Sequence, residues 1–155
     1  MKIKEIHIYG YGKMKDRSFT DLQDLQVFFG YNEAGKSTIM SFIHSILFGF
    51  PTKTQNENRY EPKEHSAYGG KLVLVTGRDG EVAVPRIKGK ASGDVTATYS
   101  DGRRGAEKEL SDILQGVDKS TYQSIFSFDL NGLSELQKLS ENEVSRFMLS
   151  AGLLG

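Results

Sequence analysis

A glycine-rich loop set between a short apolar run and a helical apolar pattern constrains this chain more than any other feature. Residues 30–37 read GYNEAGKS, which is the G-x-x-x-x-G-K-[ST] spacing of a phosphate-binding (Walker A) loop. Glycine permits the left-handed backbone that lets N–H groups approach phosphates closely. A helix beginning near Lys36 would direct its positive end at the same anion. The pattern therefore predicts a strand, a phosphate loop and a helix in succession.

The loop supplies candidate residues for each part of a nucleotide's phosphate chain. We expect Lys36, the candidate catalytic residue, to reach the outer phosphates, and the Ser37 hydroxyl to ligate Mg²⁺. The Thr38 hydroxyl is expected near the α-phosphate. The alternative is a glycine turn that contains Lys-Ser by chance. The candidate nucleotide-binding residues of the loop are Gly30, Asn32, Glu33, Ala34, Gly35, Lys36, Ser37 and Thr38.

The sequence on either side of the loop fits this interpretation. Before it, Val27, Phe28 and Phe29 predict a short buried strand. After it, apolar residues recur at helical spacing until Gly49 and Pro51, which predict the end of the helix. The predicted apolar face comprises Ile39, Met40, Phe42, Ile43, Ile46 and Leu47.

Composition sets limits on the function. The 155 residues suit one domain, and 37% hydrophobic with 26% charged residues is ordinary for a globular protein. No apolar run approaches a membrane span, so we expect a cytoplasmic protein without a membrane partner. Cysteine is absent and the three histidines are far apart, which excludes thiolate sites and argues against a local histidine cluster. Twenty basic and twenty acidic residues balance, so charge gives no argument for nucleic acid.

The rest of the first hundred residues predicts strands. Residues 2–9 place Ile6 and Ile8 on one face of a strand, which Ile3 joins through an irregularity, and Phe19 with the following residues suggests a second short strand and a turn. Residues 52–69 predict a long polar surface loop, which is either functional or a solvated connector. Residues 70–100 predict an antiparallel meander, with a hairpin at Asp79-Gly80 and a third strand at 94–99.

Basic residues gather on and around the meander, and helices follow it. We expect most of these basic side chains to be solvated, although contact with nucleotide or DNA phosphates is the alternative. A helix is predicted over 106–115, with Leu110, Ile113 and Leu114 on one face and Gly116 closing it. Capping boxes at 120–123 and 140–143 predict two more helices. The basic residues are Arg86, Lys88, Lys90, Arg103, Arg104 and Lys108.

Four segments resemble the N-terminal half of ATPase heads of the SMC, SbcC and RecF kind, and most closely the YhaN-like bacterial DNA repair ATPases. They are IHIYGYGKM at 6–14, GYNEAGKST at 30–38, YEPKEHSAYGGKLVL at 60–74 and STYQSIFSFDLNGLSEL at 120–136. The resemblance implies an α/β P-loop NTPase fold, with residues 1–155 forming the N-terminal lobe of an ABC/SMC-type head. Within it, 1–50 would hold strands, Walker A and helix, 51–69 a loop, 70–100 the meander and 105–155 the helical part.

In that family the head is split by a long coiled coil, and a C-terminal lobe carries the signature motif and Walker B. The resemblance therefore implies ATP and Mg²⁺ as ligands, and as partners the C-terminal lobe of the parent chain and a second head in a head-to-head homodimer. DNA and an SbcD-like nuclease are implied by family analogy alone. The parent protein would be an ATPase in DNA repair, and these residues alone would hydrolyse ATP slowly or not at all.

Two departures from the family pattern limit the chemistry visible in the chain. Where relatives carry a Q-loop glutamine, residues 128–132 read FDLNG, so Asp129 or Asn131 could offer the oxygen for a hydrated Mg²⁺, and an ordinary turn is the alternative. Asp129 is thus a further nucleotide-site candidate. No stretch of four apolar residues precedes Asp-Glu, so a Walker B carboxylate is missing from the sequence. The start of a signature motif suggested by 149–152 is better interpreted as a helix end.

Three other functions are compatible with a phosphate loop. A GTPase would use Asp129-x-x-Gly132 as a switch, but the chain has no Asn-Lys-x-Asp motif to read guanine. A small-molecule kinase would need an arginine-rich lid, and the 52–69 loop holds only Arg59. A binding module without catalysis is the third alternative.

Overall fold

The computed structural model describes residues 1–30, 35–52, 60–63, 67–89 and 93–125. Contacts between residues divide the chain into two compact units, Met1–Ile113 and Leu114–Gly155. Within the described residues, no helix combines the length and the apolar character needed to cross a membrane.

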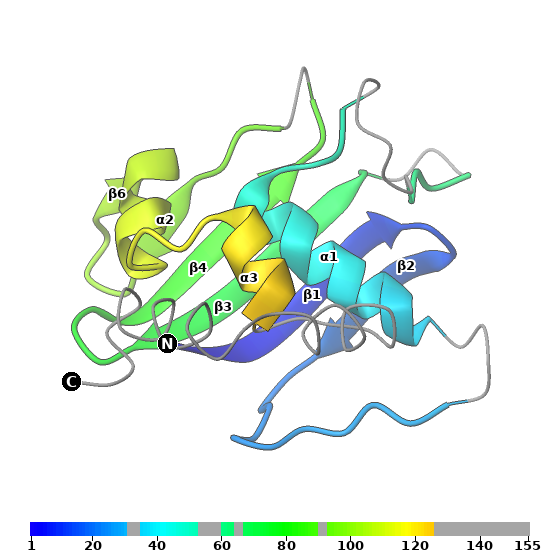
Figure 1. Cartoon of the computed structure of the whole chain (residues 1–155), viewed down its shortest axis with the longest axis horizontal. Coiled ribbons are helices and arrows are strands. Elements are labelled where there is room, and N and C mark those ends of the chain that lie inside the picture. The colour runs from blue at the N-terminus through cyan, green and yellow to red at the C-terminus, as the bar shows by residue number, and fades with distance from the viewer. Residues whose placement is uncertain (31–34, 53–59, 64–66, 90–92, 126–155) are drawn as a thin grey trace, which may run out of the picture. The chain divides into compact units, whose positions relative to one another are not determined.

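A six-stranded antiparallel sheet forms the frame of the first unit (Figure 1). Its strand order is β2-β1-β3-β4-β5-β6, and each neighbouring pair runs antiparallel. The predicted antiparallel meander is confirmed as β3, β4 and β5, and together with the helices it makes the fold α/β. The strands are β1 (Lys2–Tyr11), β2 (Met14–Phe19), β3 (Gly69–Thr76), β4 (Gly80–Ile87), β5 (Ala97–Tyr99) and β6 (Arg104–Gly105).

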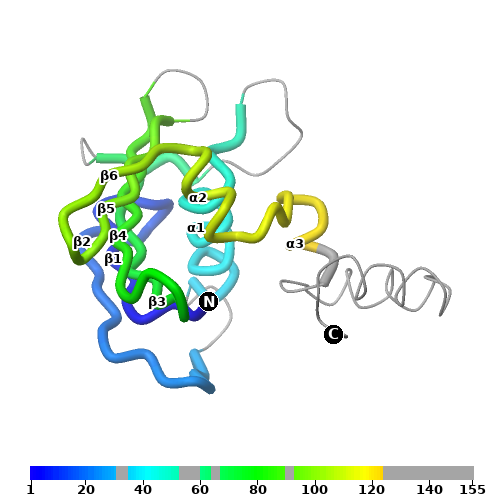
Figure 2. Tube along the Cα trace, turned by 90° about the vertical axis from the view of Figure 1, so that its left-hand side faces the viewer, coloured from blue at the N-terminus to red at the C-terminus, as the bar shows by residue number. Residues whose placement is uncertain are grey.

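Two helices lie along one face of this sheet, as Figure 2 shows. They are α1 (Lys36–Phe48) and α2 (Glu107–Ile113). The helical face predicted for α1 is confirmed at its core, because Ile39, Phe42, Ile46 and Leu47 are buried. Under the helices, cross-strand partners bury their side chains together: Ile6, Leu72 and Val84 in one row, and Leu74, Val82 and Tyr99 in another.

Strand β1 follows the predicted pattern and continues further than predicted. Ile6 and Ile8 are both buried, and the pairing with β3 shifts register between Ile3 and Glu5, which confirms the irregularity at Ile3. The strand runs on to Tyr11 and turns at Gly12, whose φ is +61°. The predicted second short strand is present as β2, but it lies earlier than predicted, because it ends at Phe19.

The buried strand predicted at 27–29 is also wrong. These residues have no regular secondary structure, and the side chains of Val27 and Phe29 are 73% and 95% exposed. Phe28 alone is half-buried, with its ring edge-on to Phe19 at 5.3 Å between centroids. An apolar run is buried only where another strand or helix covers it. The described sheet has no strand paired with residues 27–29.

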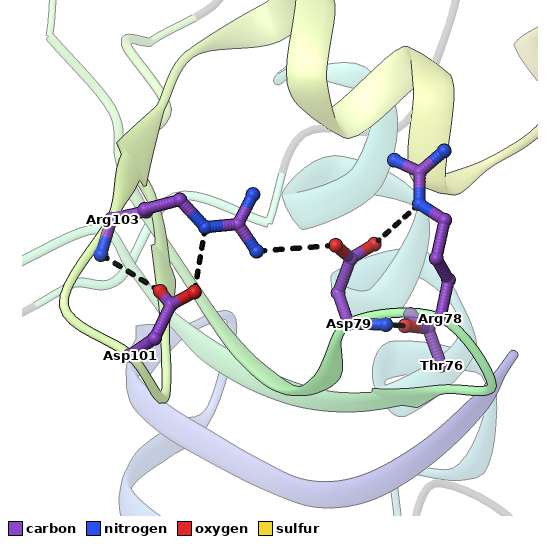
Figure 3. A network of polar contacts seen from close by, with 5 residues as sticks. All are labelled: Thr76, Arg78, Asp79, Asp101 and Arg103. Carbon is purple, nitrogen blue, oxygen red and sulfur yellow. Dashed lines mark hydrogen bonds and ion pairs between the residues drawn. The ribbon is translucent and has the colours of Figure 1, made fainter.

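The hairpin predicted at Asp79-Gly80 is confirmed, and polar contacts fix its turn (Figure 3). The backbone N–H of Asp79 donates to Thr76 Oγ1 at 2.9 Å, and the Asp79 carboxylate accepts from Arg78 and Arg103. Arg103 also donates to Asp101 at 2.6 Å and lies over the Tyr99 ring. These hydrogen bonds hold the pKa of Asp101 below its ordinary value.

Arg86 corrects the expectation of a solvated basic face. Its side chain is 1% exposed and lies on the buried face of β4. The guanidinium donates to the carbonyl oxygens of Ile46 at 2.8 Å and Gly93 at 3.1 Å, and it forms a bidentate pair with the Glu107 carboxylate. A buried cation is tolerated when it is paired with a carboxylate and hydrogen-bonded in this way. Arg86 thereby ties the end of α1 and the start of α2 to the sheet.

The helices predicted over 106–115 and near 121 are confirmed with shifted boundaries. In the first unit, α2 buries Leu110 and Ile113. In the second unit, α3 (Lys119–Ile125) begins ahead of the predicted capping box, because the Thr121 N–H donates to Asp118 Oδ1 at 2.8 Å. This bond lowers the pKa of Asp118. The helix predicted near 141 and the helix end at 149–152 lie outside the described residues.

Replacing Gly70 with alanine tests the packing of α1 on the sheet. A Cβ at Gly70 would lie 2.0 Å from the His7 carbonyl oxygen and 2.7 Å from Cζ of Phe42, so backbone or ring must move. We expect Gly70→Ala to lower the free energy of unfolding by at least about 2 kcal/mol, the scale of overpacking a close-packed core. The measurement is chemical denaturation followed by circular dichroism.

Gly77→Ala is the matched control, because a Cβ there meets nothing within 4 Å. We expect it to change stability by less than about 0.5 kcal/mol. Equal stabilities for the two variants would contradict the close approach of Phe42 to β3.

Candidate functional site

The glycine-rich loop ends where α1 begins. Gly35 has φ +92° in the left-handed region, and the Ile39 N–H donates to the Gly35 carbonyl at 3.0 Å as the first helical hydrogen bond. This is the helix start predicted from the spacing. Only glycine adopts such a backbone without strain, so the position of Gly35 fixes both the direction of the loop and the axis of the helix.

The lysine of the loop reaches back across it. Lys36 is exposed, and its ammonium donates to the Gly30 carbonyl, which joins the two ends of the loop. Ser37 is exposed and Thr38 is half-buried on the first turn of α1. The structure thus brings Gly30, Gly35 and these three side chains to one place. Their binding roles stay predictions.

The remaining predicted site residues are outside the part that the structure describes. Asn32, Glu33 and Ala34 fall in one such segment, and Asp129 with Asn131 falls in another. Their proposed roles therefore rest on the sequence alone.

The turn between β1 and β2 packs against the start of α1. A Cβ added to Gly35 would lie 2.3 Å from Cε of Met14, so the methionine covers the helix start. A Cβ added to Gly12 would lie 3.6 Å from Cγ2 of Thr38. The absence of side chains at both glycines lets this turn approach the start of α1. The turn also carries Lys13, which is exposed.

Tyr11 connects the end of β1 to helix α1. It is fully buried at the end of β1, and its hydroxyl lies 2.7 Å from Ser45 Oγ and 2.8 Å from Ser41 Oγ. The hydroxyl also donates to the Ser41 carbonyl at 3.1 Å. Its ring packs edge-on against Phe42 with 5.4 Å between centroids. A buried hydroxyl with several partners fixes position because leaving it unpaired is costly.

Tyr60 lies beside this turn although it is far away in the sequence. Its ring stacks on that of Tyr11 with centroids 5.3 Å apart and an interplanar angle of 19°. Its carbonyl accepts a hydrogen bond from the Gly12 N–H at 2.6 Å. Sequence reasoning did not assign Tyr11 or Tyr60 to the site. A glycine-flanked tyrosine at a strand end was the available signal, but nothing in the pattern pairs it with Tyr60.

Two basic residues of the meander, Arg86 and Arg103, do not join the loop. The register pairs Gly10 of β1 with Gly69, at the loop end of the sheet, and Lys2 with Val75 at the other end. The hairpin turn held by Arg103 therefore lies at the far end of the strands. Arg86 is committed to Glu107 and to backbone carbonyls.

Taken together, the loop end of the sheet offers the groups that bind a phosphate chain. They are the amides at a helix N-terminus, one lysine ammonium and a serine hydroxyl. Among the described residues, no three His, Asp or Glu side chains gather as a metal centre would require. The arrangement can hold an anion.

Comparison with known proteins identifies the chain's relatives. It is 40% identical over 159 residues to an uncharacterized protein, YhaN, of Bacillus subtilis strain 168. The alignment covers 100% of this chain and 16% of that relative. The AAA_27 family model, described as an AAA domain, matches residues 1–153. That match supports nucleotide binding of the ATPase type. The chain therefore belongs to the AAA_27 family of AAA domains.

Proposed function

We propose that residues 1–155 form the ATP-binding half of an SMC/SbcC-like ATPase head, with 30–38 as its Walker A loop. The observation that carries the proposal is the joining of this loop to α1 at a left-handed Gly35, with Lys36 bonded back across the loop to Gly30. At the start of α1, backbone N–H groups and the Lys36 ammonium can converge on phosphate oxygens. Membership of an AAA domain family supports the same function.

The residues present fit ATP with Mg²⁺. The first turn of α1 carries Lys36 and no acidic residue, so an anion meets no opposing carboxylate there. Ser37 would hold the metal through its hydroxyl, and Thr38 would contact the α-phosphate side. When bound, Mg²⁺ neutralises charge on the phosphates. Lys36 would exchange the Gly30 carbonyl for a phosphate oxygen, which is the stronger, charge-assisted partner.

Exposed apolar side chains next to the loop support completion of the head by another part of the parent protein. Leu25, Val27 and Phe29 alternate along the chain and are all strongly exposed. Alternation of this kind is typical of a strand that packs on one face. Covering three such side chains is favourable. A C-terminal lobe that packs beside 25–29 would both cover them and bring the Walker B carboxylate.

The chain spans 16% of the length of its relative, so the activity and partners of a whole protein are proposals only. Head-to-head dimerisation, DNA and an SbcD-like nuclease stay predictions from the family resemblance, as does a role in DNA repair. GTP and ATP differ only in the base, so the phosphate loop alone does not choose between them.

Loss of the Lys36 ammonium should weaken nucleotide binding. We expect Lys36→Ala to weaken Mg-ATP binding at least tenfold, because a charge-assisted hydrogen bond to phosphate is worth about 1.5–3 kcal/mol. Isothermal titration calorimetry of the 155-residue chain measures this. Competition between ATP and GTP in the same assay tests the GTPase alternative.

Lys108→Ala is the control, since Lys108 is an exposed lysine on α2. It should leave the affinity unchanged. Unchanged affinity in the Lys36 variant as well would contradict the proposal and favour a module in which the loop is structural.

The isolated chain should bind ATP but turn it over slowly or not at all. Phosphoryl transfer needs a positioned water in addition to charge neutralisation, and the carboxylate that positions it is expected on the missing lobe. A steady-state phosphate-release assay checks this. Normal turnover that Lys36→Ala abolishes would show that the 155 residues contain a complete active site.

A further inference from the structure

Tyr60 is an aromatic ring held in place at the edge of the phosphate loop. Its Cδ1 lies 3.2 Å from the position that a Cβ on Gly12 would occupy, and Cγ2 of Thr38 lies 3.6 Å from the same point. The two side chains are therefore neighbours across the β1–β2 turn. Thr38 is on the first turn of α1, directly after the residues expected to bind the outer phosphates.

The ring is also preorganised. One side of it stacks on Tyr11, which the hydroxyls of Ser41 and Ser45 hold to α1. The Gly12 N–H fixes the Tyr60 backbone at 2.6 Å. The side chain is nevertheless only half-buried, so part of the ring faces away from the core. An aromatic ring fixed at one face and accessible elsewhere can contact a ligand with little further loss of conformational entropy.

On these observations we propose that Tyr60 forms the nucleoside side of the site and contacts the base of the bound nucleotide. A nucleotide whose outer phosphates lie at Lys36 extends past Thr38 toward its ribose and base. Tyr60 is an aromatic side chain close to Thr38. Stacking on an aromatic face is tolerant of base identity, so the contact adds affinity for a nucleoside triphosphate over a bare phosphate chain without selecting one base.

This inference rests on the proposed function, and the test separates the two. The ligands are Mg-ATP, Mg-GTP and Mg-tripolyphosphate, which carries the phosphate chain without a nucleoside. The proteins are the wild-type chain, Tyr60→Leu, Tyr60→Phe and Lys36→Ala, each measured by calorimetry, with thermal unfolding as a check on folding. Tyr60→Phe keeps the ring and Tyr60→Leu removes it.

We expect Tyr60→Leu to weaken ATP and GTP binding about tenfold and to leave tripolyphosphate affinity unchanged. Tyr60→Phe should bind all three ligands as the wild type does. Unchanged tripolyphosphate affinity shows that the loop is intact in the leucine variant, so the loss can be assigned to the nucleoside.

If Lys36→Ala weakens ATP binding, the proposed function holds, and two outcomes would then overturn the inference about Tyr60 alone. One is unchanged ATP affinity in Tyr60→Leu. The other is equal weakening of ATP and tripolyphosphate, which would mean that Tyr60 acts only by supporting the turn. Failure of the wild-type chain to bind either ligand overturns the proposed function and the inference with it.

Discussion

The hydroxyl of Tyr11 is the contact on which the geometry of the loop end depends. It lies within the sheet's β1 strand yet makes its hydrogen bonds with Ser41 and Ser45 of α1. Because a buried hydroxyl must find polar partners, this contact fixes the middle of α1 against the end of β1. The Gly12 turn, the Met14 cover over Gly35 and the stacked Tyr60 ring all follow from that placement.

A second polar contact holds the last turn of α1. Arg86 donates to the carbonyl of Ile46 in that turn and pairs with Glu107 at the start of α2. Between Ser41 and Ser45, Gly70 lets the Phe42 ring rest on β3. The middle and the last turn of the helix that carries Lys36 are therefore fixed by polar contacts and by close packing. A phosphate site benefits from this rigidity, because preorganised donors lose little entropy when an anion binds.

Local signals in the sequence predicted the parts of the fold that depend on local chemistry. The start of α1 at Lys36 follows from Gly35, and the hairpin follows from Asp79-Gly80. The strand at 27–29 was wrong because apolar character predicts burial without saying which chain provides the cover. Long-range contacts explain the other failures. Arg86 was expected to be a solvated cation because its partners, the Glu107 carboxylate and two backbone carbonyls, come from other segments of the chain.

The same limit applies to the candidate site. The spacing of glycine, lysine and serine identified the loop, because each residue type has a role that no neighbour can fill. The sequence did not predict that Tyr11 and Tyr60 support the site, because their stacking joins segments that are far apart in the chain. The site thus consists of a local motif that sequence reasoning finds and a supporting shell that only the tertiary structure supplies.

Amide hydrogen exchange with and without Mg-ATP tests most directly the claim that this loop is a nucleotide site. The account predicts slower exchange at 30–38 and at the neighbouring Gly12, in the wild-type chain but not in Lys36→Ala. It predicts no change in the Thr76–Gly80 hairpin at the far end of the sheet. Unchanged exchange at 30–38 in saturating Mg-ATP, or protection confined to the far hairpin, would contradict it.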